Sequence, residues 1–317
     1  FEVVDDVDRA VDAARRLGYP AVLKVDGLAA GKGVLVARDA AEARAFAFEC
    51  LVGGRFGAAA ERLVVEAFLP GEEASLFFLT DGERVRRFLP ARDYKRLADG
   101  DEGPNTGGMG AFAPARLDPA LAQHVEDAVA RPTLAALAAQ GAPFRGLLYV
   151  GLMIGPAGPR VLEFNARFGD PETQVLLPLV DGDLGALLLE CAEGRLASPL
   201  SFREGATVGV VLAAPGYPEA PRTGETIDGL DAWPAPDAED RAECWCFHAG
   251  TKLEDGRVVT SGGRVLTVVA RAADRAESRR RAYEAAARLR FPGAQVRTDV
   301  ARDVTGAERV PARQARV

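Results

Sequence analysis

The sequence has 317 residues and contains few histidines, cysteines and lysines. With only two histidines, it cannot build a metal site from several histidines, and a histidine-based triad is disfavoured. The four cysteines show neither zinc-site spacing nor a CxxC motif, so we expect buried free thiols. No apolar run approaches the roughly 20 residues that cross a bilayer. We therefore expect a cytoplasmic protein without a membrane partner.

Composition and charge indicate further which class of protein this is. The chain is 48% hydrophobic and 27% charged, which is typical of a globular protein, and its length predicts two or three domains. A net charge of -7 argues against a general nucleic-acid binder. We expect a monomer that acts on small molecules.

Lysine is used sparingly. Of 39 cationic residues, four are lysines: Lys24, Lys32, Lys95 and Lys252. Where arginine serves as the general surface cation, lysine is expected at places that need a compact, flexible charge. All four lie in polar or glycine-containing stretches.

The stretch VLEFNARFGDPE, residues 161–172, combines an apolar strand with a polar cluster. Strand alternation places Glu163 and Asn165 on one face. A carboxylate and an amide oxygen form a ligand set that suits Mg²⁺, and Arg167 can clamp a developing phosphate charge. The alternative is a surface strand with alternating polar residues.

A glycine-rich loop, residues 26–33, connects predicted strands at 21–25 and 34–38. Its glycines allow positive φ and bring N–H groups together around phosphate, with two lysines nearby. The residues concerned are Lys24, Gly27, Gly31, Lys32 and Gly33. The loop lacks the Walker pattern, because Val34 stands where Ser or Thr should follow. A glycine-rich hairpin without a ligand remains the alternative.

Residues 62–82 predict two strands around a turn at Pro70 and Gly71. Glu66, Phe68 and Leu69 suit a segment between two lobes, with apolar and backbone groups for an adenine and a carboxylate for ribose hydroxyls. Glu73 follows at the base of the next strand. Taken alone, FLPGEE is more often a charged turn.

Residues 92–112 predict a long polar loop without regular structure, which in a compact protein indicates function or disorder. Asp93 and Lys95 add one charge of each sign. Side-chain and backbone donors follow at Asn105, Thr106, Gly107 and Gly108. Such a loop could hold an anionic or amine substrate against the metal site.

Hydrophobic spacing predicts the remaining elements. Helices are expected at 6–17, 40–51, 119–140 and 274–289, and a strand at 146–155. From residue 206 onward, short strands and turns predict a separate α+β domain. We expect domains at 1–72, 73–204 and 205–304, followed by a tail at 305–317.

Five stretches occur in the order of one known family: VLKVDGLAAGKGV, EAFLPGEEAS, GPNTGGMGAF, EFNARFGDPETQ and FHAGTK. Together they resemble the phosphoribosylamine-glycine ligases of purine biosynthesis over residues 1–304. The resemblance implies an α/β and α+β architecture: an ATP-grasp fold, in which two α+β lobes clasp ATP, and a small C-terminal α+β domain. It also implies that ATP phosphorylates glycine and that the amine of phosphoribosylamine attacks the glycyl phosphate.

The resemblance also implies roles for the residues above. Lys24 and the 26–33 loop bind ATP phosphates, Glu66 to Leu69 and Glu73 bind the nucleotide, and Glu163 and Asn165 hold Mg²⁺ or Mn²⁺. Arg167, Lys24, Asp93 and Lys95 are expected to be catalytic, and Asp170 joins residues 105–108 at the substrate. Lys252 could fold back over the site, or stand exposed in a hairpin.

The chain departs from the family pattern at its start. It begins with Phe1 and lacks the family's Rossmann-like N-terminal part, so we expect a segment of a larger protein. Such a segment should bind ATP and metal weakly, form little product, and leave apolar surface of 73–204 uncovered. Alternative functions are another ATP-grasp ligase or carboxylase, or an inactive ATP-binding fragment.

Overall fold

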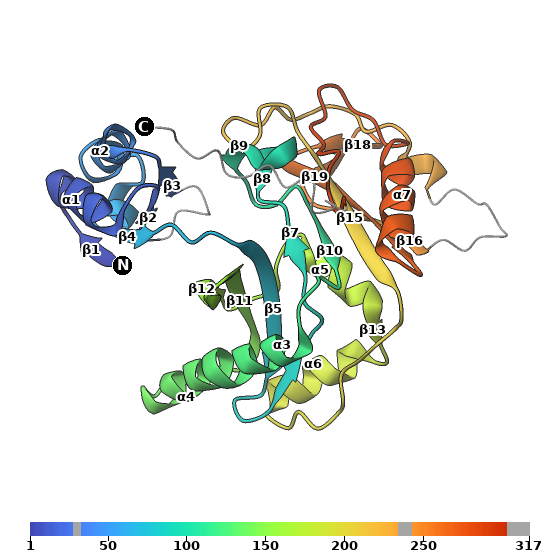
Figure 1. The fold of residues 1–317 in the computed structure, drawn as a ribbon. Coiled ribbons are helices and arrows are strands. Elements are labelled where there is room, and N and C mark those ends of the chain that lie inside the picture. Colours follow the sequence, from blue (N-terminus) through green and yellow to red (C-terminus); the bar gives the residue numbers. More distant parts are fainter. Residues whose placement is uncertain (28–32, 234–242, 303–317) are drawn as a thin grey trace. The chain divides into compact units, whose positions relative to one another are not determined.

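The computed structural model describes residues 1–27, 33–233 and 243–302 (Figure 1). These residues form two compact units. Unit 1 contains Phe1–Glu72 with two short pieces, Asn105–Gly107 and Met153–Arg160. Unit 2 contains Glu73–Pro104, Gly108–Leu152 and the described residues from Val161 onward. Each unit is described by itself.

Unit 1 is a four-stranded sheet with two helices, and its strand order is β1-β4-β2-β3. The pairings β1·β4, β2·β4 and β2·β3 are all antiparallel. Its elements are β1 (Glu2–Val4), α1 (Val7–Leu17), β2 (Ala21–Val25), β3 (Val34–Ala37), α2 (Ala40–Leu51) and β4 (Leu63–Ala67). A core of small and aliphatic residues, including Ala10, Leu23 and Val65, fills the space between helices and sheet.

The ends of α1 follow from its sequence. The Asp6 carboxylate accepts hydrogen bonds from the N–H groups of Asp8 and Arg9, which caps the first turn. The helix ends at Gly18, whose φ of 87° is a conformation that favours glycine. Its buried face carries Ala10 and Val11, so the predicted amphipathic helix at 6–17 is confirmed.

Unit 2 is built around two sheets. The four-stranded sheet has the order β12-β11-β5-β6, and the five-stranded sheet has the order β16-β19-β15-β10-β7. The strands of the first are β5 (Glu72–Thr80), β6 (Val85–Arg87), β11 (Gly146–Gly155) and β12 (Gly158–Asn165). Those of the second are β7 (Arg92–Asp93), β10 (Gly110–Ala113), β15 (Ala206–Ala213), β16 (Glu243–His248) and β19 (Arg264–Ala272).

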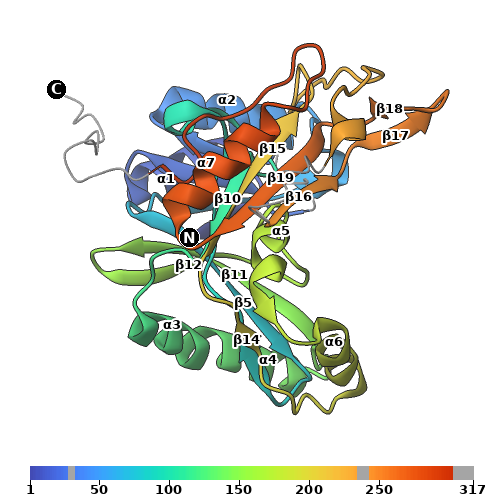
Figure 2. The same ribbon diagram turned by 90° about the vertical axis from the view of Figure 1, so that its right-hand side faces the viewer.

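Helices cover both faces of the five-stranded sheet. Val208 and Val210 of β15 pack in one core with α7 (Arg275–Ala286), which Figure 2 shows against β15 and β19. On the other face, Gly209 leaves room for Val175 of α5 (Glu172–Leu176), because a Cβ at Gly209 would lie 2.9 Å from that side chain. Alternation along β15 therefore serves two cores.

The remaining elements of unit 2 are short. Three strand pairs, β8·β9, β13·β14 and β17·β18, form two-stranded sheets. Their bounds are β8 (Arg96–Ala98), β9 (Glu102–Asn105), β13 (Val180–Asp181), β14 (Ser201–Phe202), β17 (Thr251–Glu254) and β18 (Arg257–Thr260). The other helices are α3 (Pro119–Val125), α4 (Arg131–Ala139) and α6 (Leu184–Glu193).

One prediction about local structure is wrong. Residues 92–112 are not a structureless loop, because β7, β8 and β9 lie within them and β10 begins there. The helix predicted at 119–140 is confirmed: α3, a π-helical turn at Glu126–Ala130 and α4 follow one another without a break. Pro132 has no N–H to continue the regular hydrogen-bond ladder, and a π turn is a common way to accommodate such an interruption.

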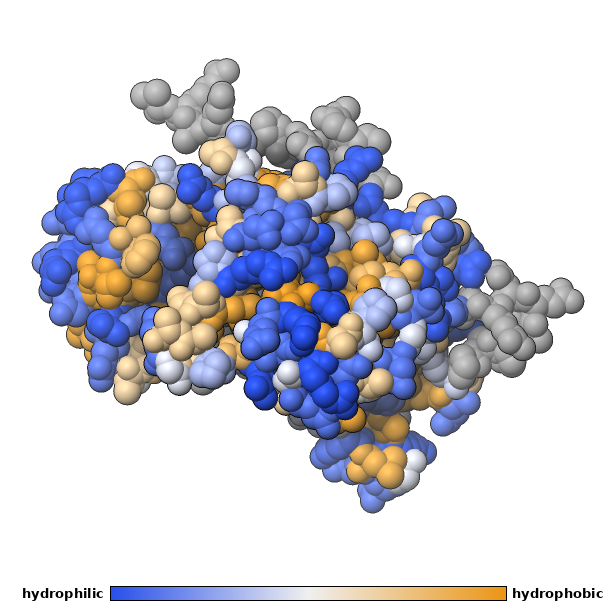
Figure 3. Space-filling view, turned by 90° about the horizontal axis from the view of Figure 1, so that it is seen from below, coloured by the Kyte–Doolittle hydropathy of each residue, from blue (hydrophilic) through white to orange (hydrophobic). Residues whose placement is uncertain are grey.

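The described residues contain no helix long and apolar enough to cross a membrane. On the face in Figure 3, hydrophobic residues form several separate patches among hydrophilic ones. Within 73–204, the exposed large apolar side chains include Val161, Phe164 and Leu189. The predicted aggregation of this surface stays a prediction.

Candidate active site

Three of the predicted site residues meet in unit 2. Lys95 Nζ lies 2.9 Å from Oδ2 of Asp93 and 3.9 Å from Oε1 of Glu163. Asp93 ends β7 on the five-stranded sheet, and Glu163 lies on β12 of the other sheet. The fold thus joins residues about 70 positions apart through one ammonium group.

Burial and neighbouring charges determine the protonation state of the Lys95 ammonium group. Burial alone would lower the pKa of Lys95, but Asp93 and the neighbouring carboxylates outweigh that effect and raise it, so the side chain stays cationic. Glu73, on β5, belongs to the same electrostatic cluster. Its pKa is raised by burial and then by the charge of Asp93.

Three further residues of this cluster were not predicted. Ser75 Oγ lies 3.0 Å from the Tyr149 hydroxyl and donates to Glu172 Oε1 at 3.4 Å. Glu172 is 2% exposed, and burial, followed by the charge of Asp93, raises its pKa. A Cβ at Gly169 would lie 2.6 Å from Glu172 Oε2, so a larger residue there would displace this carboxylate. The sequence offered one sign of these residues: Ser75 and Tyr149 are polar residues within otherwise apolar strands.

Glu163 and Asn165 lie two residues apart on the edge strand β12, as alternation predicted, and Glu163 is exposed. Gly151 of β11 makes room for Glu163, since a Cβ there would lie 3.0 Å from Glu163 Cγ. The described residues contain no cluster of three or more acidic, histidine or cysteine ligands. A carboxylate and an amide oxygen are hard ligands of the kind that Mg²⁺ accepts beside water and phosphate oxygens.

The GDPE turn follows this strand. Arg167 is exposed, and its Nη1 donates to the Phe168 carbonyl at 2.8 Å. Asp170 is held from β19, because Arg264 Nη1 donates to its carbonyl at 2.7 Å and Arg264 Nη2 lies 3.1 Å from Oδ2. Gly108 approaches the same turn, since a Cβ on it would lie 2.5 Å from Cδ of Pro171.

The described nucleotide residues other than Glu73 lie in unit 1. Lys24 Nζ is 2.6 Å from Glu66 Oε2, so the two side chains from β2 and β4 form a partly buried ion pair. Phe68, just after β4, is 42% exposed, and Leu69 follows it. The expected substrate residues Asn105, Thr106 and Gly107 also group with unit 1.

The glycine loop is described only at its ends. Gly31 and Lys32 lie outside the described residues. Gly33 accepts a hydrogen bond from Val25 N at 2.8 Å. Gly27 does not adopt the positive φ that glycine allows, and its backbone instead approaches Ala59 closely, because a Cβ on Gly27 would lie 2.5 Å from Cα of Ala59.

Lys252 lies in the β17–β18 hairpin. Its Nζ is 2.9 Å from Glu254 Oε1, and both side chains are half exposed. Its predicted role in closing the site stays a prediction.

The family comparison supports the sequence resemblance. Residues 1–173 match the model of the phosphoribosylglycinamide synthetase ATP-grasp (A) domain, and residues 207–303 match that of the C domain. A phosphoribosylamine-glycine ligase from Streptomyces coelicolor is 50% identical over 305 residues, covering 95% of this chain and 70% of that protein. One from Caulobacter vibrioides is 48% identical over 307 residues, covering 95% of this chain and 70% of that protein.

Solved structures agree with this match. The phosphoribosylamine-glycine ligase of Thermotoga maritima has a TM-score of 0.84 at 36% identity, covering 94% of this chain and 73% of that chain. A biotin carboxylase from Campylobacter jejuni, at 13% identity and a TM-score of 0.65, covers 92% of this chain and 62% of that chain and shares the fold alone. The predicted ATP-grasp fold with a C-terminal domain is confirmed, and the chain belongs to the phosphoribosylglycinamide synthetase family.

Proposed function

We propose that this chain carries the site that joins glycine to 5-phosphoribosylamine at the expense of ATP. A glycine carboxylate oxygen attacks the γ-phosphorus, the bond to the leaving oxygen breaks, and ADP departs. The amine nitrogen then attacks the glycyl carbonyl carbon, the bond to the phosphate oxygen breaks, and the amine loses a proton. The products are glycinamide ribonucleotide, ADP and phosphate. The observation that carries the proposal is the grouping of Lys95 with Asp93 and Glu163, within a chain of this family.

Each residue has a role suited to its environment. Lys95, kept cationic by Asp93, supplies a fixed positive charge for phosphate or carboxylate oxygens. Glu163 and Asn165 would hold Mg²⁺ or Mn²⁺, which neutralises charge on the transferred phosphoryl group. Arg167, exposed next to this strand, would bind the same developing charge.

The other predicted residues complete the proposal. Lys24 and Glu66, with the loop around Gly27 and Gly33, would bind ATP, and Phe68 and Leu69 would contact its base. Residues 105–108 and Asp170 would hold the other substrates. We place domain boundaries after residues 72, 204 and 304, and we propose a cytoplasmic monomer.

The second candidate is an ATP-grasp carboxylase, which the fold shared with biotin carboxylases keeps open. Substrate dependence separates the two. ADP formation should be measured with ATP, metal and either glycine or bicarbonate, and then with phosphoribosylamine added. Glycine-dependent ADP formation supports the ligase, and bicarbonate-dependent ADP formation that ignores glycine supports the carboxylase.

A further inference from the structure

Arg297 is a charged side chain in the interior of unit 2. It is 1% exposed and is the largest of the fully buried side chains among the described residues. A guanidinium ion taken out of water destabilises the fold unless its charge and its N–H groups are matched. Its partners therefore show which parts of the chain are held in place here.

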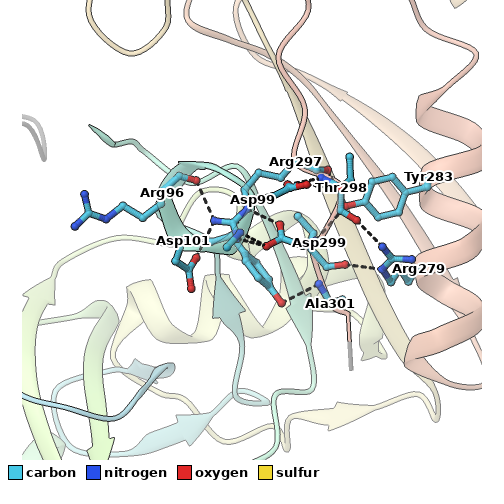
Figure 4. A network of polar contacts seen from close by, with 12 residues as sticks. Arg96, Asp99, Asp101, Arg279, Tyr283, Arg297, Thr298, Asp299 and Ala301 are labelled. Carbon is cyan, nitrogen blue, oxygen red and sulfur yellow. Dashed lines mark hydrogen bonds and ion pairs between the residues drawn. The ribbon is translucent and has the colours of Figure 1, made fainter. Parts of the chain in front are cut away.

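Two aspartates and one carbonyl oxygen surround the guanidinium (Figure 4). Asp299 is bound through both oxygens, at 2.7 Å from Nε and 2.6 Å from Nη2. Nη1 donates to Asp101 Oδ1 at 2.8 Å and to the Arg96 carbonyl at 3.1 Å. One side chain near the C-terminal end thus binds a turn about 200 residues earlier, with the two-pronged geometry that lysine cannot reproduce.

Further hydrogen bonds join the same two segments. Thr298 N donates to Asp99 Oδ1 at 2.8 Å, and the Thr298 hydroxyl donates to the other oxygen of that carboxylate. Gly100 N donates to Asp299 Oδ2 at 2.9 Å. The Asp99–Asp101 turn is therefore held through both backbone and side chains.

Tyr94 links this network to the active site. Its ring lies 4.8 Å from the Arg297 guanidinium carbon, and its hydroxyl accepts from Ala301 N at 2.8 Å. Its backbone N–H donates to the Gly110 carbonyl at 2.9 Å. The residues on either side of Tyr94 are Asp93 and Lys95, the ion pair at the centre of the site.

Helix α7 holds the other side of the 297–301 segment. The Tyr283 hydroxyl donates to the Arg297 carbonyl at 2.8 Å, and Arg279 Nε donates to the Val300 carbonyl at 3.0 Å. The segment is thus bound to a helix on one side and to residues 94–101 on the other.

We propose that Arg297 is a positioning residue for ligation, which holds residues 94–101 against the 297–301 segment so that Lys95 stays in place beside Asp93 and Glu163. The proposal rests on the proposed role of Lys95. Arg297 acts only through Tyr94 and the Asp99–Asp101 turn. The competing explanation is a purely structural side chain, whose loss lowers stability without changing the reaction.

The test compares conservative variants of the full chain. Arg297→Lys keeps the charge and loses the two-pronged contact with Asp299, whereas Tyr94→Phe removes only the acceptor of Ala301 N. Arg86→Lys is the matched control, because Arg86 also binds carbonyl oxygens, those of Ser198 and Ala197, away from residues 94–101. Lys95→Met tests the role of Lys95 by itself.

Kinetics and hydrogen exchange provide two independent readouts. We expect Arg297→Lys to lower kcat for glycine-dependent ADP formation roughly 10-fold to 100-fold, as misplaced groups do, with an unchanged KM for ATP. Rates are compared well below the Tm of each variant, because loss of the buried contacts also lowers the Tm of Arg297→Lys. Tyr94→Phe should lower kcat in the same direction. Amides of residues 94–101 should exchange faster in Arg297→Lys, and those of β15 should not.

Several outcomes would overturn the proposal. If Arg297→Lys lost activity only in proportion to Tm, as Arg86→Lys does, the residue would be structural. Unchanged exchange of residues 94–101 would remove the physical link. If Lys95→Met kept the wild-type kcat, the proposed function of Lys95 would fail, and this inference with it. If Lys95→Met lost activity and Arg297→Lys retained it, only the positioning role would fail.

Discussion

Lys95 and Asp93 form an ion pair across a single intervening residue, with Nζ 2.9 Å from Oδ2 and the Asp93 side chain only 3% exposed. The carboxylate therefore depends on this ammonium group for its charge balance. Because Lys95 also approaches Glu163, the pair links the interior of unit 2 to the proposed metal site.

This arrangement predicts that a double variant at Lys95 and Asp93 recovers stability without recovering activity. Lys95→Met should destabilise the protein by roughly 1–3 kcal/mol, because the Asp93 carboxylate stays buried without its partner. Adding Asp93→Asn removes that charge and should restore most of the stability but none of the activity. Urea denaturation and ADP formation measure the two effects, and full additivity of the stability changes would contradict the pairing.

Glu163→Gln and Asn165→Leu should each abolish metal-dependent ATP turnover while preserving the fold. Each removes one of few protein oxygens for the metal. Arg160→Gln is the control, since alternation places it on the opposite face of β12. Turnover should be titrated with Mg²⁺ and with Mn²⁺. Near-normal Mg²⁺-dependent turnover in either variant would remove that residue from the site.

Lys24→Arg should weaken ATP binding although the charge is kept. The Lys24–Glu66 contact is partly buried, and a bulkier guanidinium changes its geometry. Loss of one charge-assisted hydrogen bond of about 1.5–3 kcal/mol weakens affinity by roughly one to two decades. Arg15→Lys, in the exposed pair with Asp12 on α1, should bind ATP normally. Calorimetric titration giving equal affinity for Lys24→Arg and wild type would contradict the assignment.

Arg264→Met should raise the KM for glycine or phosphoribosylamine about 10-fold, since Asp170 loses two contacts that orient it. The single variant Asp170→Asn should have a similar effect. If Arg264 acts through Asp170, the double variant should be no worse than either single one. Independent, multiplying effects in initial-rate measurements would show that the two residues act separately.

The hydrogen bonds to Asp81 predict that the protein loses stability in acid. Burial by itself would raise its pKa, but hydrogen bonds from the N–H groups of Arg84, Glu83 and Leu196 lower it to about 2. A lowered folded-state pKa contributes stability above the unfolded value near 3.8, and that contribution is lost as pH falls toward 2. Asp81→Asn should cost roughly 1–2 kcal/mol at pH 7 and flatten the stability profile between pH 4 and 2. An unchanged profile would contradict the assignment.

Local patterns predicted much of the framework. The strand predicted at VLEFN is confirmed as part of β12, because strand propensity and alternation are local properties. The cap at Asp6 and the end at Gly18 also follow from local chemistry. Residues 92–112 were misjudged, because they contain short strands whose pairing, such as that of β10 with the distant β15, leaves no clear local pattern among the glycines and polar residues.

The residues that the sequence did not reveal were missed for one common reason. Ser75, Tyr149 and Glu172 lie on three separate elements, and their contacts depend on how those elements pack. Arg297 lies among polar residues near the end of the described chain, yet it is 1% exposed and two of its partners lie about 200 residues earlier. Long-range pairing of this kind leaves no local periodicity to detect.

The central claim is that these residues ligate glycine to phosphoribosylamine. The most direct measurement is glycine-dependent release of phosphate from ATP, with and without phosphoribosylamine, alongside mass-spectrometric detection of glycinamide ribonucleotide. It should be made for the wild-type protein and for Glu163→Gln. We predict glycine-dependent release coupled one-to-one to product in the wild type, and neither in Glu163→Gln. Phosphate release that ignores glycine, or that survives Glu163→Gln, would contradict it.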